Sequence, residues 1–234
     1  MDIEPRLAGL EWDVIERSLD EYGYAVTPAV LSAAECEDIV RLYAVDGRFR
    51  SRVVMARHNF GSGEYKYFSR PLPATVEALR TGFYPCLAPL ANRWAERLGE
   101  TGYPAECAEF LETCARAGQV KPTPLVLRYE TGDFNCLHQD LYGDVAFPLQ
   151  VTVALSRREA DYSGGEFLLL EQRPRAQSRG QAVTLEQGEA VVFATHHRPV
   201  RGARGYYRVN MRHGVSRLLS GDRYTLGIIF HDAR

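Results

Sequence analysis

The chain lacks several features that mark common protein classes. Its 234 residues contain no apolar run of the length that a membrane-spanning helix needs, about 18 residues or more. The opening stretch MDIEPRLAGLEWDVIERS is acidic and has no apolar segment, so no secretory signal is expected. No CxxC pair occurs, and the spacing of the cysteines is irregular, which predicts reduced thiols in a cytoplasmic protein. The five cysteines are Cys36, Cys86, Cys107, Cys114 and Cys136.

The chain also lacks a strong net charge, which is −2, so overall charge gives no case for nucleic acid or an anionic membrane. The distribution is uneven. Residues 1–156 carry 15 basic and 22 acidic side chains (−7), and residues 157–234 carry 13 and 8 (+5). All thirteen of the latter basic residues are arginine, which is favoured where planar anions bind. A solvated arginine-rich face is the alternative interpretation.

The first 120 residues have mainly helical patterns. Segment 31–47 begins with Ser32 and Glu35 in capping-box spacing, and segments 73–99 and 105–118 have the apolar periodicity of helices. Pro85 and Pro89 are expected to break or kink the second of these helices. Segment 49–73 combines a short β-like run with two glycines and predicts a loop and hairpin.

After residue 120 the sequence changes to short runs rich in β-branched and aromatic residues, separated by Gly, Pro, Ser and Asp. This pattern predicts an α+β protein with a mainly β core, a sandwich or jelly roll that carries helices on its outside. We expect one domain over 1–234, with a helical support region at 1–120 and a jelly-roll core at 121–234. The expected strands lie at 123–130, 145–156, 164–171, 182–185, 189–195, 206–214 and 223–232.

The stretch NCLHQDLYGD places His138 and Asp140 two residues apart after a strand-like run. On a strand, positions i and i+2 point to the same side, so the imidazole and the carboxylate would meet. Either a metal site or a structural ion pair would use this arrangement. The motif gains weight if a second histidine lies on a later strand, and the candidates are His196, His197, His213 and His231.

His213 is the preferred candidate because Arg223 and Thr225 follow it on another strand-like run. If 215–221 is a loop, His213 ends one strand and Arg223 opens its antiparallel neighbour. His196 and His197 follow the strand 189–195 and are rivals for the same role. We expect His231 to be a rim residue.

Two histidines and one carboxylate are the ligand set of non-haem Fe(II) oxygenases, and they leave room for a bidentate 2-oxoacid and dioxygen. The far carboxylate of 2-oxoglutarate needs a cation, which Arg223 offers as a planar fork, and Thr225 can add a hydrogen bond. Zn²⁺ could use the same ligands, but a zinc hydrolase would not need a distal arginine.

The series His138, Asp140, His213, Arg223 and Thr225 resembles the 2-oxoglutarate/Fe(II)-dependent oxygenase superfamily over residues 123–232. The phrase LRYETGDFNCLHQD is similar to the superfamily's entry strand, and the resemblance implies that Tyr129 contacts the cosubstrate. Segment 49–73 and the phrase LAPLANRW resemble a bacterial branch predicted to modify nucleic acids. The resemblance implies a double-stranded β-helix, bound Fe(II), and conversion of 2-oxoglutarate and O₂ to succinate and CO₂ as a substrate C–H bond is oxidised.

The substrate is not identified by the sequence. Arginines at 171–181 and 198–208, beside Tyr206 and Tyr207, would suit a single-stranded or flipped nucleobase substrate. They would equally suit an acidic small molecule or a peptide. The prediction is therefore hydroxylation or oxidative demethylation, with an amino acid, peptide or metabolite hydroxylase and a cupin-like metal-binding protein as alternatives. Candidate substrate contacts are His58, Lys66, Tyr142 and Gln150.

Overall fold

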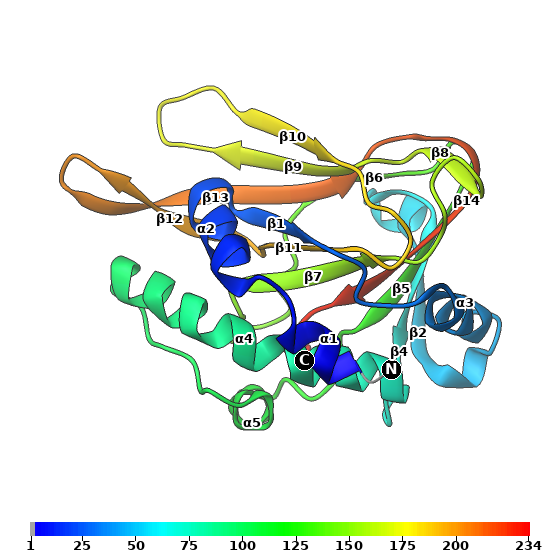
Figure 1. The fold of residues 1–234 in the computed structure, drawn as a ribbon, viewed down its shortest axis with the longest axis horizontal. Helices are drawn as coiled ribbons and strands as arrows, with labels where there is room; N and C mark the ends of the chain where they lie inside the picture. The colour runs from blue at the N-terminus through cyan, green and yellow to red at the C-terminus, as the bar shows by residue number, and fades with distance from the viewer. Residues whose placement is uncertain (1–2) are drawn as a thin grey trace.

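Two antiparallel sheets face each other and form the jelly roll that the strand pattern predicts (Figure 1). The structure is a computed structural model that describes residues 3–234. The larger sheet has the order β1 (Tyr24–Thr27), β11 (Ala190–Ala194), β7 (Leu149–Ala154), β14 (Leu218–Ile228), β5 (Leu125–Glu130), β4 (Glu64–Phe68) and β2 (Phe49–Val54), with β8 (Tyr162–Gly164) paired to β14. The smaller sheet has the order β10 (Arg179–Val183), β9 (Phe167–Gln172), β13 (Gly205–Val215), β6 (Phe134–His138) and β3 (Gly61–Ser62), with β12 (His197–Gly202) paired to β13.

Helices from the N-terminal half cover the outer face of the larger sheet, as expected (Figure 1). The contact is strongly aromatic: Tyr84 of α4 packs against Phe147 and Phe230 at ring-centroid distances of 4.8 and 5.9 Å. Burial of these aromatic side chains favours docking of α4 on the sheet. The helices are α1 (Ile3–Ala8), α2 (Trp12–Tyr22), α3 (Ala33–Leu42), α4 (Ala74–Leu98) and α5 (Cys107–Arg116), with 3-10 turns at Asp46–Arg48 and Met55–His58.

Of the break or kink expected in the second helix, the break does not occur, because α4 continues through both Pro85 and Pro89, and the kink stays a prediction. Each proline removes one helical hydrogen bond, at a cost of about 3 kcal/mol. Eleven buried residues along α4 offset this cost by packing against the sheet and the neighbouring helices. The capping box at the start of α3 is present as predicted, between Ser32 and Glu35.

Strands from the N-terminal half extend the larger sheet at both edges. The hairpin expected at 49–73 is present, with β2 antiparallel to β4, and β4 pairs with β5. At the opposite edge β1 pairs with β11. A division at residue 120 therefore does not separate helices from sheet, and the single-domain assignment stays a prediction.

All seven predicted strand runs overlap strands of the structure, and β1, β6, β8 and β12 are additional. Two hairpins, β9–β10 and β12–β13, project to the left in Figure 1, and the β12–β13 hairpin extends past the end of α4. Within residues 3–234, no helix is long and apolar enough to cross a membrane.

Candidate active site

A cavity of about 390 Å³ lies between the two sheets. Its wall on the larger sheet comes from inward side chains of β4, β5, β7, β11 and β14, and its other wall comes from β6, β9 and β13. All six residues predicted for the site line it, and they are Tyr129, His138, Asp140, His213, Arg223 and Thr225. The structure thus brings together residues that are widely separated in the sequence.

Three of these side chains form a compact cluster. Nε2 of His213 lies 3.1 Å from Oδ2 of Asp140, and Nε2 of His138 lies 3.5 Å from Oδ1 of the same carboxylate. One ligand atom from each residue falls within 4.8 Å of the others, which is close enough to hold one metal ion. Two imidazoles and one carboxylate are a donor set that suits Fe(II).

The backbone brings the cluster together in a different way from that expected. His138 is the last residue of β6 and is the Cα partner of His213 on β13. Asp140 lies two residues beyond the end of β6, so the expectation that it shares a strand face with His138 was wrong. The carboxylate reaches the cluster from the loop that follows the strand.

Hydrogen bonds around the cluster fix the orientation of its ligands. Nδ1 of His138 lies 2.8 Å from the carbonyl oxygen of Cys136, which assigns the proton to Nδ1 and leaves Nε2 free to bind a metal. The Tyr142 hydroxyl donates to Oδ1 of Asp140 at 2.7 Å. Between the two, the Gln139 amide donates to backbone carbonyls of β13 and of the segment before β12.

The electrostatics favour the metal-binding protonation states of Asp140 and His213, but not that of His138. Burial opposes the charged form of Asp140, but His213 and His138 outweigh it and hold the pKa of this carboxyl well below its usual value. Burial and the charge of His138 lower the pKa of His213. Burial also disfavours the charged form of His138, but the hydrogen bond with Asp140 gives its pKa a net rise. An ionised carboxylate and a neutral His213 are the forms that coordinate a metal ion.

A buried cation lies in the wall of the same cavity. Arg223 of β14 is 3% exposed, and its Nε and Nη1 atoms have no hydrogen-bond partner among the described residues. Its guanidinium lies 5.6 Å from the ring centre of Tyr129, its Cα partner on β5, and Thr225 faces the same way. An unpaired buried guanidinium is costly unless an anion binds it, so this end of the cavity suits a carboxylate.

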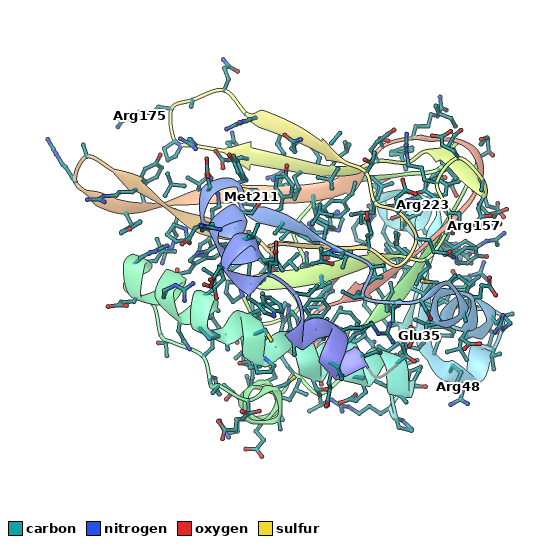
Figure 2. All side chains as sticks on the ribbon, in the orientation of Figure 1. Glu35, Arg48, Arg157, Arg175, Met211 and Arg223 are labelled. Carbon is teal, nitrogen blue, oxygen red and sulfur yellow. The ribbon has the colours of Figure 1, made fainter. Side chains whose placement is uncertain are left out.

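Glycine makes room for that cation. Gly165 has a φ of +64°, and a Cβ there would lie 2.6 Å from Leu218 and 3.1 Å from Cδ of Arg223. Gly164 ends β8 and Gly165 follows it, both with positive φ, and the absence of a side chain at Gly165 leaves space beside the arginine. Figure 2 shows Arg223 within the body of the protein, near β8 and β14.

The predicted strand relationship of His213 and Arg223 needs correction. The connection between β13 and β14 is only Ser216–Arg217, and Arg223 lies in the middle of β14 rather than at its start. The two strands are not paired neighbours, because β13 belongs to the smaller sheet and β14 to the larger. His213 and Arg223 therefore lie on opposite walls of the cavity.

The rival histidines lie outside the cavity. His197 pairs with Glu100 at 3.1 Å, and His196 lies beside it with burial lowering its pKa to about 4. His231 is 1% exposed, with Nδ1 accepting from the Phe147 amide, so the expectation of a rim residue was wrong. The sequence showed that these histidines lie near strands, but it did not show what their side chains contact.

The weaker candidates for substrate contact divide into two groups. Tyr142 and Gln150 line the cavity. Lys66 does not, because it is buried against Tyr43 and Asp46, and His58 is exposed and stacks on Phe60. Their surroundings could not be read from residue type alone.

Three aromatic residues of the cavity had no sequence signal of their own. Phe60 is 48% exposed in the cavity wall. Phe193 and Phe167 pack on the His213 ring at centroid distances of 4.8 and 5.8 Å. Phe167 and Phe193 alternate with outward residues on predicted strands, and that alternation was the only available clue.

Comparisons with known proteins identify the family of the chain. Residues 63–233 match the model of an oxygenase family described as catalysing oxidative methylation of damaged DNA. Two uncharacterized proteins of Mycobacterium tuberculosis, from strains CDC 1551 / Oshkosh and ATCC 25618 / H37Rv, are each 48% identical over 82% of this chain and 81% of their own length.

Solved structures show the same fold at low sequence identity. A prolyl-4-hydroxylase from Pseudomonas putida is 15% identical with a TM-score of 0.53, covering 95% of this chain and 99% of its own. A prolyl hydroxylase from Trichoplax adhaerens, in complex with a hypoxia inducible factor peptide fragment, is 16% identical with a TM-score of 0.58, covering 98% and 90%. The match over residues 63–233 shows that the chain belongs to the oxygenase family, and the solved structures share its fold.

Proposed function

We propose that this oxygenase is a 2-oxoglutarate- and Fe(II)-dependent dioxygenase that hydroxylates a methyl group on a nucleic-acid base and so removes it, in the cytoplasm. His138, Asp140 and His213 would hold the iron, and Arg223, Thr225 and Tyr129 would hold 2-oxoglutarate. The observation that carries the site assignment is the convergence of all six residues on one cavity. Among the described residues, this cavity holds the only group of His and Asp/Glu side chains that could bind a metal, and a buried arginine without a hydrogen-bond partner at Nε and Nη1 lies in its wall.

Different residues of the cavity would bind the metal, bind 2-oxoglutarate and exclude water. The three ligands fix the metal on one side, and Tyr142 holds the Asp140 carboxylate in place. Arg223 binds the far carboxylate of 2-oxoglutarate as a charged fork, with the Thr225 hydroxyl beside it. Phe167 and Phe193 pack against His213 and exclude water from that side of the cluster.

Bound Fe(II) would supply the activation of O₂ that couples the two oxidations. One oxygen atom of O₂ enters succinate as 2-oxoglutarate loses CO₂, and the other enters a substrate C–H bond as a hydroxyl group. On an N-methyl group, the hydroxymethyl product breaks down to formaldehyde and an N–H group. The base then carries a hydrogen where it carried a methyl.

The surface supports a polyanionic substrate. The two projecting hairpins carry exposed arginines that make no ion pair with any described acidic residue. Arg175 extends from the tip of the β9–β10 hairpin (Figure 2), and Arg201 and Arg204 lie on the β12–β13 hairpin beside the exposed ring of Tyr206. Arginine beside aromatic rings is the pattern that binds nucleic-acid backbones and stacks on bases. A further exposed member of this set is Arg179, at the start of β10.

Not every arginine predicted for this surface belongs to it. Arg198 is 2% exposed and forms a buried ion pair with Glu171, so its role is structural. Arg173 pairs with the same Glu171, and Arg208 pairs with Glu100. The free positive charge therefore lies toward the outer parts of the hairpins.

The proposal is tested by titrating a single-stranded oligonucleotide against the wild type and the double variant Arg201→Gln/Arg204→Gln at several salt concentrations. Loss of two phosphate contacts should weaken binding and lower the slope of log affinity against log salt by about 1.4. The matched control is Arg48→Gln/Arg116→Gln, which removes two exposed arginines away from the hairpins and should bind like the wild type.

A turnover screen tests the substrate class directly. Succinate and formaldehyde should form when a single-stranded oligonucleotide treated with a methylating agent is added, and should exceed the amounts formed with the untreated oligonucleotide. Stimulation by a peptide or amino-acid pool, with none by the methylated oligonucleotide, would contradict the nucleic-acid assignment and leave the dioxygenase assignment intact.

A further inference from the structure

Gln150 is a buried polar residue whose amide nitrogen has no hydrogen-bond partner among the described residues. It lies on β7, is 2% exposed, and lines the cavity that holds the histidine–aspartate cluster. Its Nε2 atom makes no hydrogen bond to any described residue. Leaving a buried amide unpaired costs stability, and such groups in native proteins call for a specific explanation, such as a ligand that completes the bonding.

The position of Gln150 separates it from the carboxylate end of the cavity. Ala154 is the Cα partner of Thr225, and Gln150 lies four residues earlier on the same strand face, about 13 Å away along β7. Gln150 is instead the Cα partner of Phe193, whose ring packs on His213 at 4.8 Å. A 2-oxoglutarate molecule that reaches from Arg223 to the metal ligands is short, and it leaves the Gln150 end of the cavity for another molecule.

The chemistry of this end differs from that of the Arg223 end. A carboxamide is neutral and places two N–H donors beside a carbonyl acceptor. Its neighbours in the cavity wall include the apolar side chains of Leu125, Phe193 and Ile229. A neutral amide within an apolar wall is poorly suited to a carboxylate and well suited to a flat, uncharged ring edge that presents an acceptor next to a donor.

We infer that Gln150 recognises the substrate by hydrogen bonding to the polar edge of a planar heterocycle, as a flipped-out nucleobase would present it. This inference rests on the proposed function, whose substrate it narrows. A site built to hydrogen-bond a polar edge discriminates strongly against rings that lack it, because the buried amide would then stay unpaired. Gln150 would thus decide which methylated bases are accepted, while 2-oxoglutarate binds independently of it.

The test compares Gln150→Leu with the wild type in two measurements. The first is kcat/KM for succinate release with a single-stranded oligonucleotide treated with a methylating agent, and it should fall 10-fold to 100-fold. The second is calorimetric binding of 2-oxoglutarate with Mn²⁺ in place of Fe²⁺, and the dissociation constant should stay within about twofold of the wild-type value. Since Nε2 is unpaired in the folded chain, the variant should also melt no lower than the wild type.

The matched control is Gln187→Leu, which removes a carboxamide that bonds to the Leu155 carbonyl outside the cavity and should leave kcat/KM unchanged. An unchanged kcat/KM in Gln150→Leu would overturn the inference. An equal loss of 2-oxoglutarate affinity, or a lowered melting temperature that accounts for the lost activity, would also overturn it. A wild type that the methylated oligonucleotide does not stimulate would instead overturn the proposed function, and this inference with it.

Discussion

The imidazole of His213 and the carboxylate of Asp140 meet across the end of the smaller sheet, with 3.1 Å between Nε2 and Oδ2. His138 approaches the same carboxylate from the strand beside β13. Because no lysine or arginine pairs with Asp140, only the two histidines compensate its buried charge within the described residues. A divalent cation would complete this compensation, and this requirement makes the cluster testable.

Removal of His213 should abolish tight metal binding. His213→Ala takes away one of three ligands, and we expect the affinity for Mn²⁺ or Co²⁺ to fall by at least 10²-fold, measured by calorimetry on the metal-free protein. His197→Ala is the control, because His197 pairs with Glu100 outside the cavity and should leave the affinity unchanged. The opposite ranking of the two variants would place the metal elsewhere.

Tyr142 should influence the metal without touching it. Tyr142→Phe removes the hydrogen bond to Oδ1 of Asp140, and loss of such a support typically weakens metal binding 10-fold to 100-fold. Tyr67→Phe removes the contact between the Tyr67 and Tyr142 hydroxyls, 3.0 Å apart, and the one with Tyr65, but leaves the bond to Asp140 and should have a smaller effect. If Tyr142→Phe binds metal like the wild type, the hydroxyl does not orient the ligand.

Arg223 should govern 2-oxoglutarate affinity and not metal affinity. Arg223→Ala removes a charged contact of roughly 2–3 kcal/mol, so the dissociation constant for 2-oxoglutarate should rise on the order of 10²-fold. Arg223→Lys should recover part of the loss, because the charge returns without the planar fork, and Thr225→Val should cost less. Calorimetry with Mn²⁺ in place of Fe²⁺ measures each value, and equal affinities in wild type and Arg223→Ala would exclude this arginine.

Sequence patterns were sufficient for seven of the ten strands of the C-terminal half, because alternating β-branched residues report directly on a half-buried sheet, but they did not predict β6, β8 and β12. They were also sufficient to select the residues that converge on the cavity. They did not show how those residues meet. The facing of β13 and β14 across the cavity, the loop position of Asp140 and the buried state of His231 depend on tertiary packing.

The expectation of a helix break at Pro85 and Pro89 also failed because it took no account of tertiary packing. Pro85 and Pro89 are local signals against a helix, and the eleven buried residues of α4 outweigh them. That burial depends on the aromatic cluster around Phe147, which the sequence of α4 does not contain. Similarly, the unpaired nitrogen of Gln150 could only be found once the neighbours of β7 were known.

Glu35 should make stability depend on pH in the acid range. The hydrogen bond from Arg6 lowers the pKa of Glu35 from 4.5 to about 2, so the folded chain binds fewer protons there than the unfolded chain. Its stabilising contribution is therefore full above about pH 4.5 and is lost as the pH falls toward 2. We expect Glu35→Gln to lower the free energy of unfolding by about 1 kcal/mol at pH 7, and less at pH 3.

Denaturant unfolding at both pH values measures this difference. Glu37→Gln is the matched control, because Glu37 is exposed and its contact with Arg41 is 3.6 Å, so little change is expected at either pH. A destabilisation by Glu35→Gln that is as large at pH 3 as at pH 7 would show that the ionised pair with Arg6 is not its cause.

The central claim is that His138, Asp140 and His213 hold the iron that couples 2-oxoglutarate to substrate oxidation. The most direct measurement is succinate formed per enzyme when O₂ is admitted to anaerobic protein loaded with Fe(II) and 2-oxoglutarate, in the wild type and in Asp140→Ala. We predict succinate from the wild type only, with Asp140→Ala folded by circular dichroism but inactive. Equal succinate from the two proteins would contradict the assignment of the metal site.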